Sequence, residues 1–91
     1  MKSQPARLDV SDLWRPGDSL PSGPILSAIA ERCGQIWEEP DLADKVTIGY
    51  NPRLRTTLGR AMLEDNRVEL NIHLLRAHPQ ELLGTLVHEL A

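Results

Sequence analysis

The apolar residues of the last ten positions constrain the fold of this chain more than any other feature. They recur at helical spacing and fall on one face of a helix: Leu82, Leu83, Leu86, Val87 and Leu90. At about 100° per residue, His88 falls on the opposite face, above Gly84. An apolar helix face needs a second layer to cover it. We therefore expect this helix, which begins near Pro79, to lie against a sheet with His88 turned away from the core.

The middle of the chain alternates apolar and polar residues, a pattern that is typical of strands. It predicts strands at about 46–50, 55–63 and 67–72. Gly59 within the second strand suggests a bulge or a close approach of two backbones. The polar run 64–66 predicts a turn. Because the connections are short, we expect the three strands to form an antiparallel meander.

Two further segments precede the strands. Residues 25–38 carry a helical apolar pattern, and Cys33 falls on its apolar stripe, so we expect a small buried side chain and not a nucleophile. Residues 1–24 are rich in proline, glycine and serine without any period, which we interpret as a flexible N-terminal arm that adds nothing to the core. Its one apolar spot, Leu13–Trp14, is expected to tuck against the domain surface. The predicted domain therefore comprises residues 25–91.

Composition excludes several classes of protein. A single cysteine among 91 residues excludes an internal disulfide and a cysteine-rich zinc ribbon within this stretch. The formal net charge of -3 argues against gripping nucleic acid by bulk electrostatics. No apolar run approaches the roughly 18 residues of a membrane span, and no signal-type segment opens the chain. We therefore expect a cytoplasmic protein without a membrane partner.

The last helix also carries a His-Glu pair, His88 and Glu89. In the zinc-hydrolase motif His-Glu-x-x-His, two histidines four residues apart leave the same helix face and bind one metal, while the glutamate polarises the attacking water. The second ligand would stand at position 92, one residue beyond the 91 given. A bare pair is a weak signal, because similar pairs occur on many surface helices. His73 and His78 precede the helix, where the motif supplies no ligand, and are expected to be surface or turn residues.

Three stretches together carry a more specific signal: Leu54–Ala61, Val68–Asn71 with Leu74–Leu75, and Pro79–Ala91. They closely resemble the SprT-like family of zinc metalloproteases. The resemblance implies an α+β, minimal zincin-like fold with one helix, a three-stranded antiparallel meander and then the active-site helix, within which these 91 residues end. It also implies a zinc ion that is held by two histidines of that helix and a third from a later one.

The same resemblance assigns roles to residues. His88 matches the first zinc ligand and Glu89 the catalytic general base. By analogy with zincins, the strand residues Val68, Glu69, Leu70 and Asn71 are a candidate edge for pairing with extended substrate. Eukaryotic family members degrade proteins crosslinked to DNA, so the resemblance implies a protein substrate that is DNA-associated. Arg53, Arg55 and Arg60 are candidate nucleic-acid contacts, although a solvated strand face explains them as well.

These observations leave two main hypotheses. In the first, the chain is the amino-terminal part of a SprT-like zinc metalloprotease with histidine at position 92, inactive and without tightly bound zinc as 91 residues because the second and third ligands are missing. In the second, it is a non-catalytic module that keeps the family scaffold to bind DNA or a partner protein. Self-association through unpaired strand edges is a further expectation.

Overall fold

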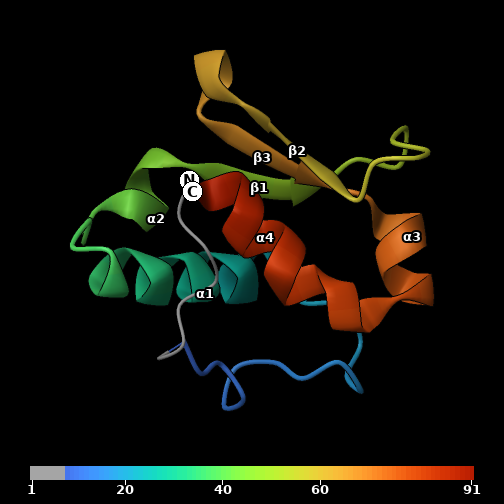
Figure 1. Ribbon diagram of the computed structural model, residues 1–91, viewed down its shortest axis with the longest axis horizontal. Coiled ribbons are helices and arrows are strands. Elements are labelled where there is room, and N and C mark those ends of the chain that lie inside the picture. Colours follow the sequence, from blue (N-terminus) through green and yellow to red (C-terminus); the bar gives the residue numbers. More distant parts are fainter. Residues whose placement is uncertain (1–7) are drawn as a thin grey trace.

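The structure is a computed structural model that describes residues 8–91. Its elements follow in chain order: α1 (Gly23–Ile36), α2 (Leu42–Lys45), β1 (Thr47–Tyr50), β2 (Gly59–Met62), β3 (Arg67–Leu70), α3 (Ile72–Ala77) and α4 (Leu82–Leu90), with 3-10 turns at Leu63–Asp65 and Pro79–Glu81. A sheet lies over a layer formed by α1 and α4, and residues 8–22 run along the far side of these helices (Figure 1). The fold is α+β, as expected.

The sheet differs from the predicted meander. Its strand order is β1-β3-β2, and β3 pairs in parallel with β1 and antiparallel with β2. The expectation of an antiparallel meander is therefore wrong for β1. Only β2 and β3 form a hairpin, whose turn ends at Asn66 in the left-handed conformation with φ of 49°. Residues 51–58 are too long a connection for a tight hairpin, and they carry the chain past the position of β3 to the other edge.

The third strand is shorter than its alternating pattern predicts. It ends at Leu70 because Asn71 caps α3, its side-chain Oδ1 accepting a hydrogen bond from the Leu74 amide at 3.1 Å. The sequence analysis missed this short helix. The apolar residues Leu70 and Ile72 alternate with polar ones, as in a strand, and this extended the predicted strand too far. Asn71 is a typical helix-capping residue, and this signal could have revealed α3.

The core lies between the sheet and the helix layer. Fully buried apolar side chains come from α1, β3, α3 and α4: Leu26, Ile29, Leu70, Leu75, Leu82 and Leu86. The prediction that the leucine face of the last helix covers a sheet is thus confirmed. Cys33 is fully buried on α1, and burial raises the pKa of its thiol to about 11. It packs as a small apolar side chain, as expected.

Residues 8–22, which we call the N-terminal strap, contribute to this core. Val10 and Trp14 belong to the same hydrophobic cluster as the α1 and α4 leucines, and Trp14 is only 4% exposed. Its indole N–H donates a hydrogen bond to the Ser19 carbonyl at 2.8 Å. The expectation that the first 24 residues add nothing to the core is therefore wrong for the strap, whereas the packing of Trp14 against the domain is confirmed. Residues 1–7 lie outside the described part of the chain.

Polar contacts fix the strap to two elements of the domain. The Arg32 guanidinium of α1 donates two hydrogen bonds to the Asp12 carboxylate, at 2.5 and 2.6 Å, and a third to the Asp9 carbonyl. This pairing lowers the pKa of Asp12 from 3.8 to about 2. The Tyr50 hydroxyl of β1 donates to the Pro21 carbonyl at 2.6 Å. The strap is therefore held at both ends. The predicted domain boundary at residue 24 stays a prediction.

Replacing Trp14 by alanine tests the strap's place in the core. Removing a buried indole leaves a cavity, so Trp14→Ala should lower the free energy of unfolding by about 3 kcal/mol. Urea unfolding followed by circular dichroism measures the change. Leu63→Ala is the matched control, because Leu63 is 86% exposed and its loss should change stability by no more than about 0.5 kcal/mol. Equal effects of the two variants would contradict the role of Trp14.

The Asp12–Arg32 pair should make stability depend on acidity. Because the folded-state pKa of Asp12 is about 2 and its ordinary value is 3.8, its contribution is present above pH 4 and is lost as the pH falls toward 2. Asp12→Asn should therefore be less stable than the parent at pH 5, and the difference should shrink toward pH 2. Urea unfolding at several pH values measures it, with the exposed Asp44→Asn as control. A difference that does not change with pH would disprove the pairing.

Candidate active site

The His-Glu pair lies at the carboxyl end of α4. The His88 side chain is 59% exposed and Glu89 is 16% exposed, with 3.9 Å between His88 Nε2 and Glu89 Oε1. The buried leucines of α4 occupy the opposite face. His88 therefore faces away from the core, as the helical spacing predicts.

An open groove of about 430 Å³ runs beside His88. One side is the segment that leads into β2 and the other is α4, and the lining residues are Thr56, Thr57, Leu58, Gly59, Glu81, Gly84, Thr85, His88 and Glu89. Gly84 shares the groove with His88, so the glycine leaves open space there, as expected. Glu89 also lines a smaller cavity of about 200 Å³ with Ala61 and Met62 of β2. The carboxylate-bearing residue thus lies along the side of α4 that faces β2.

Gly59 lets β2 and α4 approach closely. A Cβ atom at this position would lie 3.0 Å from Thr85 Cγ2 and 3.1 Å from the Glu69 carbonyl oxygen. Both distances are shorter than most Cβ contacts, so a side chain at this position would require Thr85 or the adjoining strand to shift by a few tenths of an ångström. The close backbone approach expected at Gly59 is confirmed by the Glu69 carbonyl, and Gly59 itself lines the groove beside His88.

Asn71 connects the groove to the rest of the fold. Its side chain is fully buried, with Nδ2 donating to the Thr57 carbonyl at 3.0 Å and Oδ1 accepting from the Leu74 amide. Its own amide donates to the Leu58 carbonyl at 2.8 Å. One buried residue therefore holds the groove segment with one set of hydrogen bonds and begins α3 with another. The sequence analysis assigned Asn71 to a substrate edge and missed this role.

The expectation that Val68–Asn71 forms a substrate edge is wrong. β3 is the central strand, and it is hydrogen-bonded to β1 on one side and β2 on the other. Val68 and Leu70 are buried in the core. In the described part of the chain, the strand edges without a partner belong to β1 and β2, and β2 is the one that contacts α4 beside the groove.

The three candidate nucleic-acid arginines do not share one environment. Arg60 on β2 pairs with Glu69 on β3 at 2.7 Å between Nε and Oε1. That hydrogen bond is the main cause of the lowered pKa of the Glu69 carboxyl. Arg53 and Arg55 are exposed on the connection after β1. Much of the charge of Arg60 is therefore balanced within the sheet, and the binding of nucleic acid by these residues stays a prediction.

Zinc sites in proteins use three or four protein ligands. Within residues 8–91, no group of three or more histidine, cysteine, aspartate or glutamate side chains is placed to hold a metal ion. His73 on α3 and His78 at its end are both exposed and do not join His88 in such a group. Of the three histidines, His88 is the one that lines the groove beside α4.

Comparison with known proteins identifies the family. The model of the SprT-like family matches residues 26–91, which is well over half of the chain. The chain belongs to the SprT-like family. Neither a curated protein nor a solved structure matches it. The match begins within α1 of this SprT-like chain, so the N-terminal strap lies outside it. Across residues 8–91, no helix is long and apolar enough to cross a membrane.

Substitutions at Asn71 should separate its two roles. Asn71→Asp keeps the acceptor that caps α3 but loses the donor to Thr57, so hydrogen exchange should rise in residues 56–59 while the Leu74 amide stays protected. Asn71→Leu loses both bonds, should raise exchange in both segments and should lower the free energy of unfolding by about 2–3 kcal/mol. Exchange followed by mass spectrometry or NMR measures this. A uniform rise in Asn71→Asp would show that the two roles are not separable.

Proposed function

We propose that this chain carries the first zinc ligand, His88, and the catalytic base, Glu89, of a SprT-like metallopeptidase that hydrolyses peptide bonds in protein substrates. The observation that carries the proposal is the orientation of α4. Its leucine face is buried, whereas His88 lies exposed in a groove. Membership of the SprT-like family over residues 26–91 supports the same assignment.

Glu89 is suited to proton transfer at this position. It lies beside His88 on α4 and lines the space next to β2, where a bound peptide would run. A carboxylate there would accept a proton from the attacking water and pass it to the leaving amine. A zinc ion, when bound, would supply Lewis-acid polarisation of the water.

The free edge of β2 is the best-placed surface for substrate. β2 pairs antiparallel with β3 on one side, and its other side has no strand partner in residues 8–91. An extended peptide can add to such an edge through backbone hydrogen bonds. Because β2 also packs on α4, a peptide at this edge would pass close to Glu89. The proposal therefore moves the substrate edge from β3 to β2.

We further infer that His88 is the single family ligand within the 91 residues given. The helical spacing of the motif places the second at position 92. We therefore propose that the 91 residues alone neither retain zinc nor cleave peptides. The alternative, a non-catalytic DNA-binding module, has less support because the chain is acidic overall and Arg60 is paired with Glu69. A gel shift at two salt concentrations distinguishes it, since binding through arginines weakens steeply with salt.

Two substitutions in the active helix test the proposal. In protein expressed with whatever residues its gene encodes after Ala91, we expect one zinc per chain and cleavage of an unfolded protein substrate. His88→Ala should lose both zinc and cleavage. Glu89→Gln should keep zinc and lower the rate of cleavage at least about a hundredfold, because it removes the base alone.

His73→Ala is the matched control, since His73 is an exposed histidine on α3 and should leave zinc content and cleavage unchanged. Metal content is measured by mass spectrometry, and cleavage by gel electrophoresis. Zinc that is retained in His88→Ala, or cleavage that is retained in Glu89→Gln, would overturn the assignment of the corresponding residue.

A further inference from the structure

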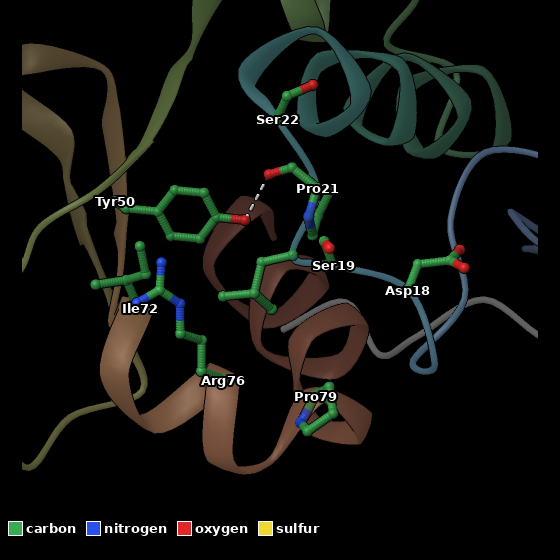
Figure 2. A pocket seen from close by; sticks show the side chains of 9 residues that line it. Asp18, Ser19, Pro21, Ser22, Tyr50, Ile72, Arg76 and Pro79 are labelled. Carbon is green, nitrogen blue, oxygen red and sulfur yellow. Dashed lines mark hydrogen bonds between the residues drawn. The ribbon is translucent and has the colours of Figure 1, made fainter.

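A second hollow lies between the N-terminal strap and α3, apart from the His88 groove. It has a volume of about 490 Å³, which is in the usual range for ligand pockets. One wall is the end of the strap and the other comes from β1, α3 and the turn that follows it (Figure 2); the lining residues are Asp18, Ser19, Leu20, Pro21, Ser22, Tyr50, Ile72, Arg76 and Pro79. No lining residue is shared with the His88 groove. The strap wall lies outside the part of the chain that matches the family.

This wall is fixed in place without a ligand. The Tyr50 hydroxyl donates to the Pro21 carbonyl at 2.6 Å, which is drawn as the dashed line in Figure 2. The Ser19 carbonyl accepts a hydrogen bond from the buried Trp14 indole. Because the chain is held on both sides of Leu20, the pocket is formed in advance, and binding a ligand would cost little ordering of the strap.

Two of the lining residues carry a charge, and only one of these turns toward the pocket. Figure 2 shows the Arg76 side chain extending from α3 toward Tyr50 and Ile72, whereas the Asp18 carboxylate points away. The Asp18 carboxylate instead accepts a hydrogen bond from the Arg15 amide at 2.9 Å. Burial raises the pKa of Tyr50 to about 12, so its hydroxyl stays neutral. The pocket therefore presents one positive charge without an opposing negative charge at its centre.

The other lining groups define what can accompany an anion. Leu20, Ile72 and Pro79 provide an apolar surface, and Ser19 and Ser22 also line the pocket. A guanidinium matches a carboxylate by two parallel hydrogen bonds. The chain as a whole has a net charge of -3, so diffuse attraction does not favour anions and any affinity has to come from these local contacts.

We propose that this pocket binds the carboxyl terminus of a peptide whose last residue is aliphatic. Arg76 holds the terminal carboxylate, the apolar wall receives the last side chain, and the serine hydroxyls contact the preceding peptide group. A volume of about 490 Å³ accommodates more than a single small anion. The site is independent of His88 and Glu89, and therefore does not depend on the proposed peptidase activity.

Titration with matched peptides tests the site. The probe is an acetylated tripeptide that ends in leucine with a free carboxylate, added to the 15N-labelled 91-residue chain and followed by NMR. We expect chemical-shift changes at Tyr50, Ile72 and Arg76 and binding at least tenfold weaker for the same peptide as a carboxyl-terminal amide. Arg76→Gln should weaken the acid peptide at least tenfold. Arg67→Gln removes an exposed arginine elsewhere and should bind as the parent does.

Three outcomes would overturn the proposal. Equal binding of acid and amide would exclude recognition of the carboxylate, and an unchanged affinity in Arg76→Gln would exclude the guanidinium as its partner. Isovalerate that binds as tightly as the peptide would show a site for small acids and not for peptide termini. The amide spectrum of Arg76→Gln reports whether the variant is folded, so a loss of binding with a native spectrum supports the proposal.

Discussion

A layer of two helices has two sides, and the sheet of this domain covers only one of them. The apolar faces of α1 and α4 pack on the sheet, α1 against β1 and α4 against β2 and β3. Without the N-terminal strap, the opposite side of this helix layer would be exposed to solvent. Trp14 and Val10 close that side, and Arg32 and Tyr50 hold the strap in place through hydrogen bonds. In a chain of this size the sheet and helices alone bury little apolar surface, so a segment without regular structure becomes part of the core. The orientation of α4, and with it that of His88, depends on burial from both sides.

The groove beside His88 depends on two residues that have no catalytic role in the proposed function. Gly59 allows β2 to approach α4, and Asn71 holds the Thr57 and Leu58 carbonyls that form the facing wall. A buried asparagine costs free energy unless its donor and acceptor groups are satisfied, and here both are. The groove therefore depends on the close packing of the Gly59 backbone and on the hydrogen bonds of the buried Asn71 amide. The Asn71 side chain therefore stabilises both the wall of the groove and the start of α3.

The sequence predicted those features that follow from periodicity. The α4 leucines, the outward position of His88 and the burial of Cys33 all depend on spacing within one element. The close approach at Gly59 followed instead from a glycine within a strand. Strand order does not follow from such spacing. The alternation of residues in β1 indicates which face of the strand is apolar, but it does not indicate which strand pairs with β1. The strap was missed since Val10 and Trp14 are single anchors without a period. The resemblance carried by three stretches together, Leu54–Ala61, Val68–Asn71 with Leu74–Leu75, and Pro79–Ala91, supplied the family. No geometric argument from His88 and Glu89 alone would have done so.

The parallel pairing of β1 with β3 has a consequence for how this domain assembles. The β2–β3 hairpin closes over the short turn at Leu63–Asn66 and brings together residues that are near in sequence. β1 pairs with β3, the farther of the two hairpin strands along the chain, so this contact joins residues that are more distant in sequence. Its docking closes a longer loop and so carries a larger entropy cost. The strap's hydrogen bond from Tyr50 to Pro21 likewise joins segments that are far apart in the chain, so the strap adds a further long-range contact to the topology.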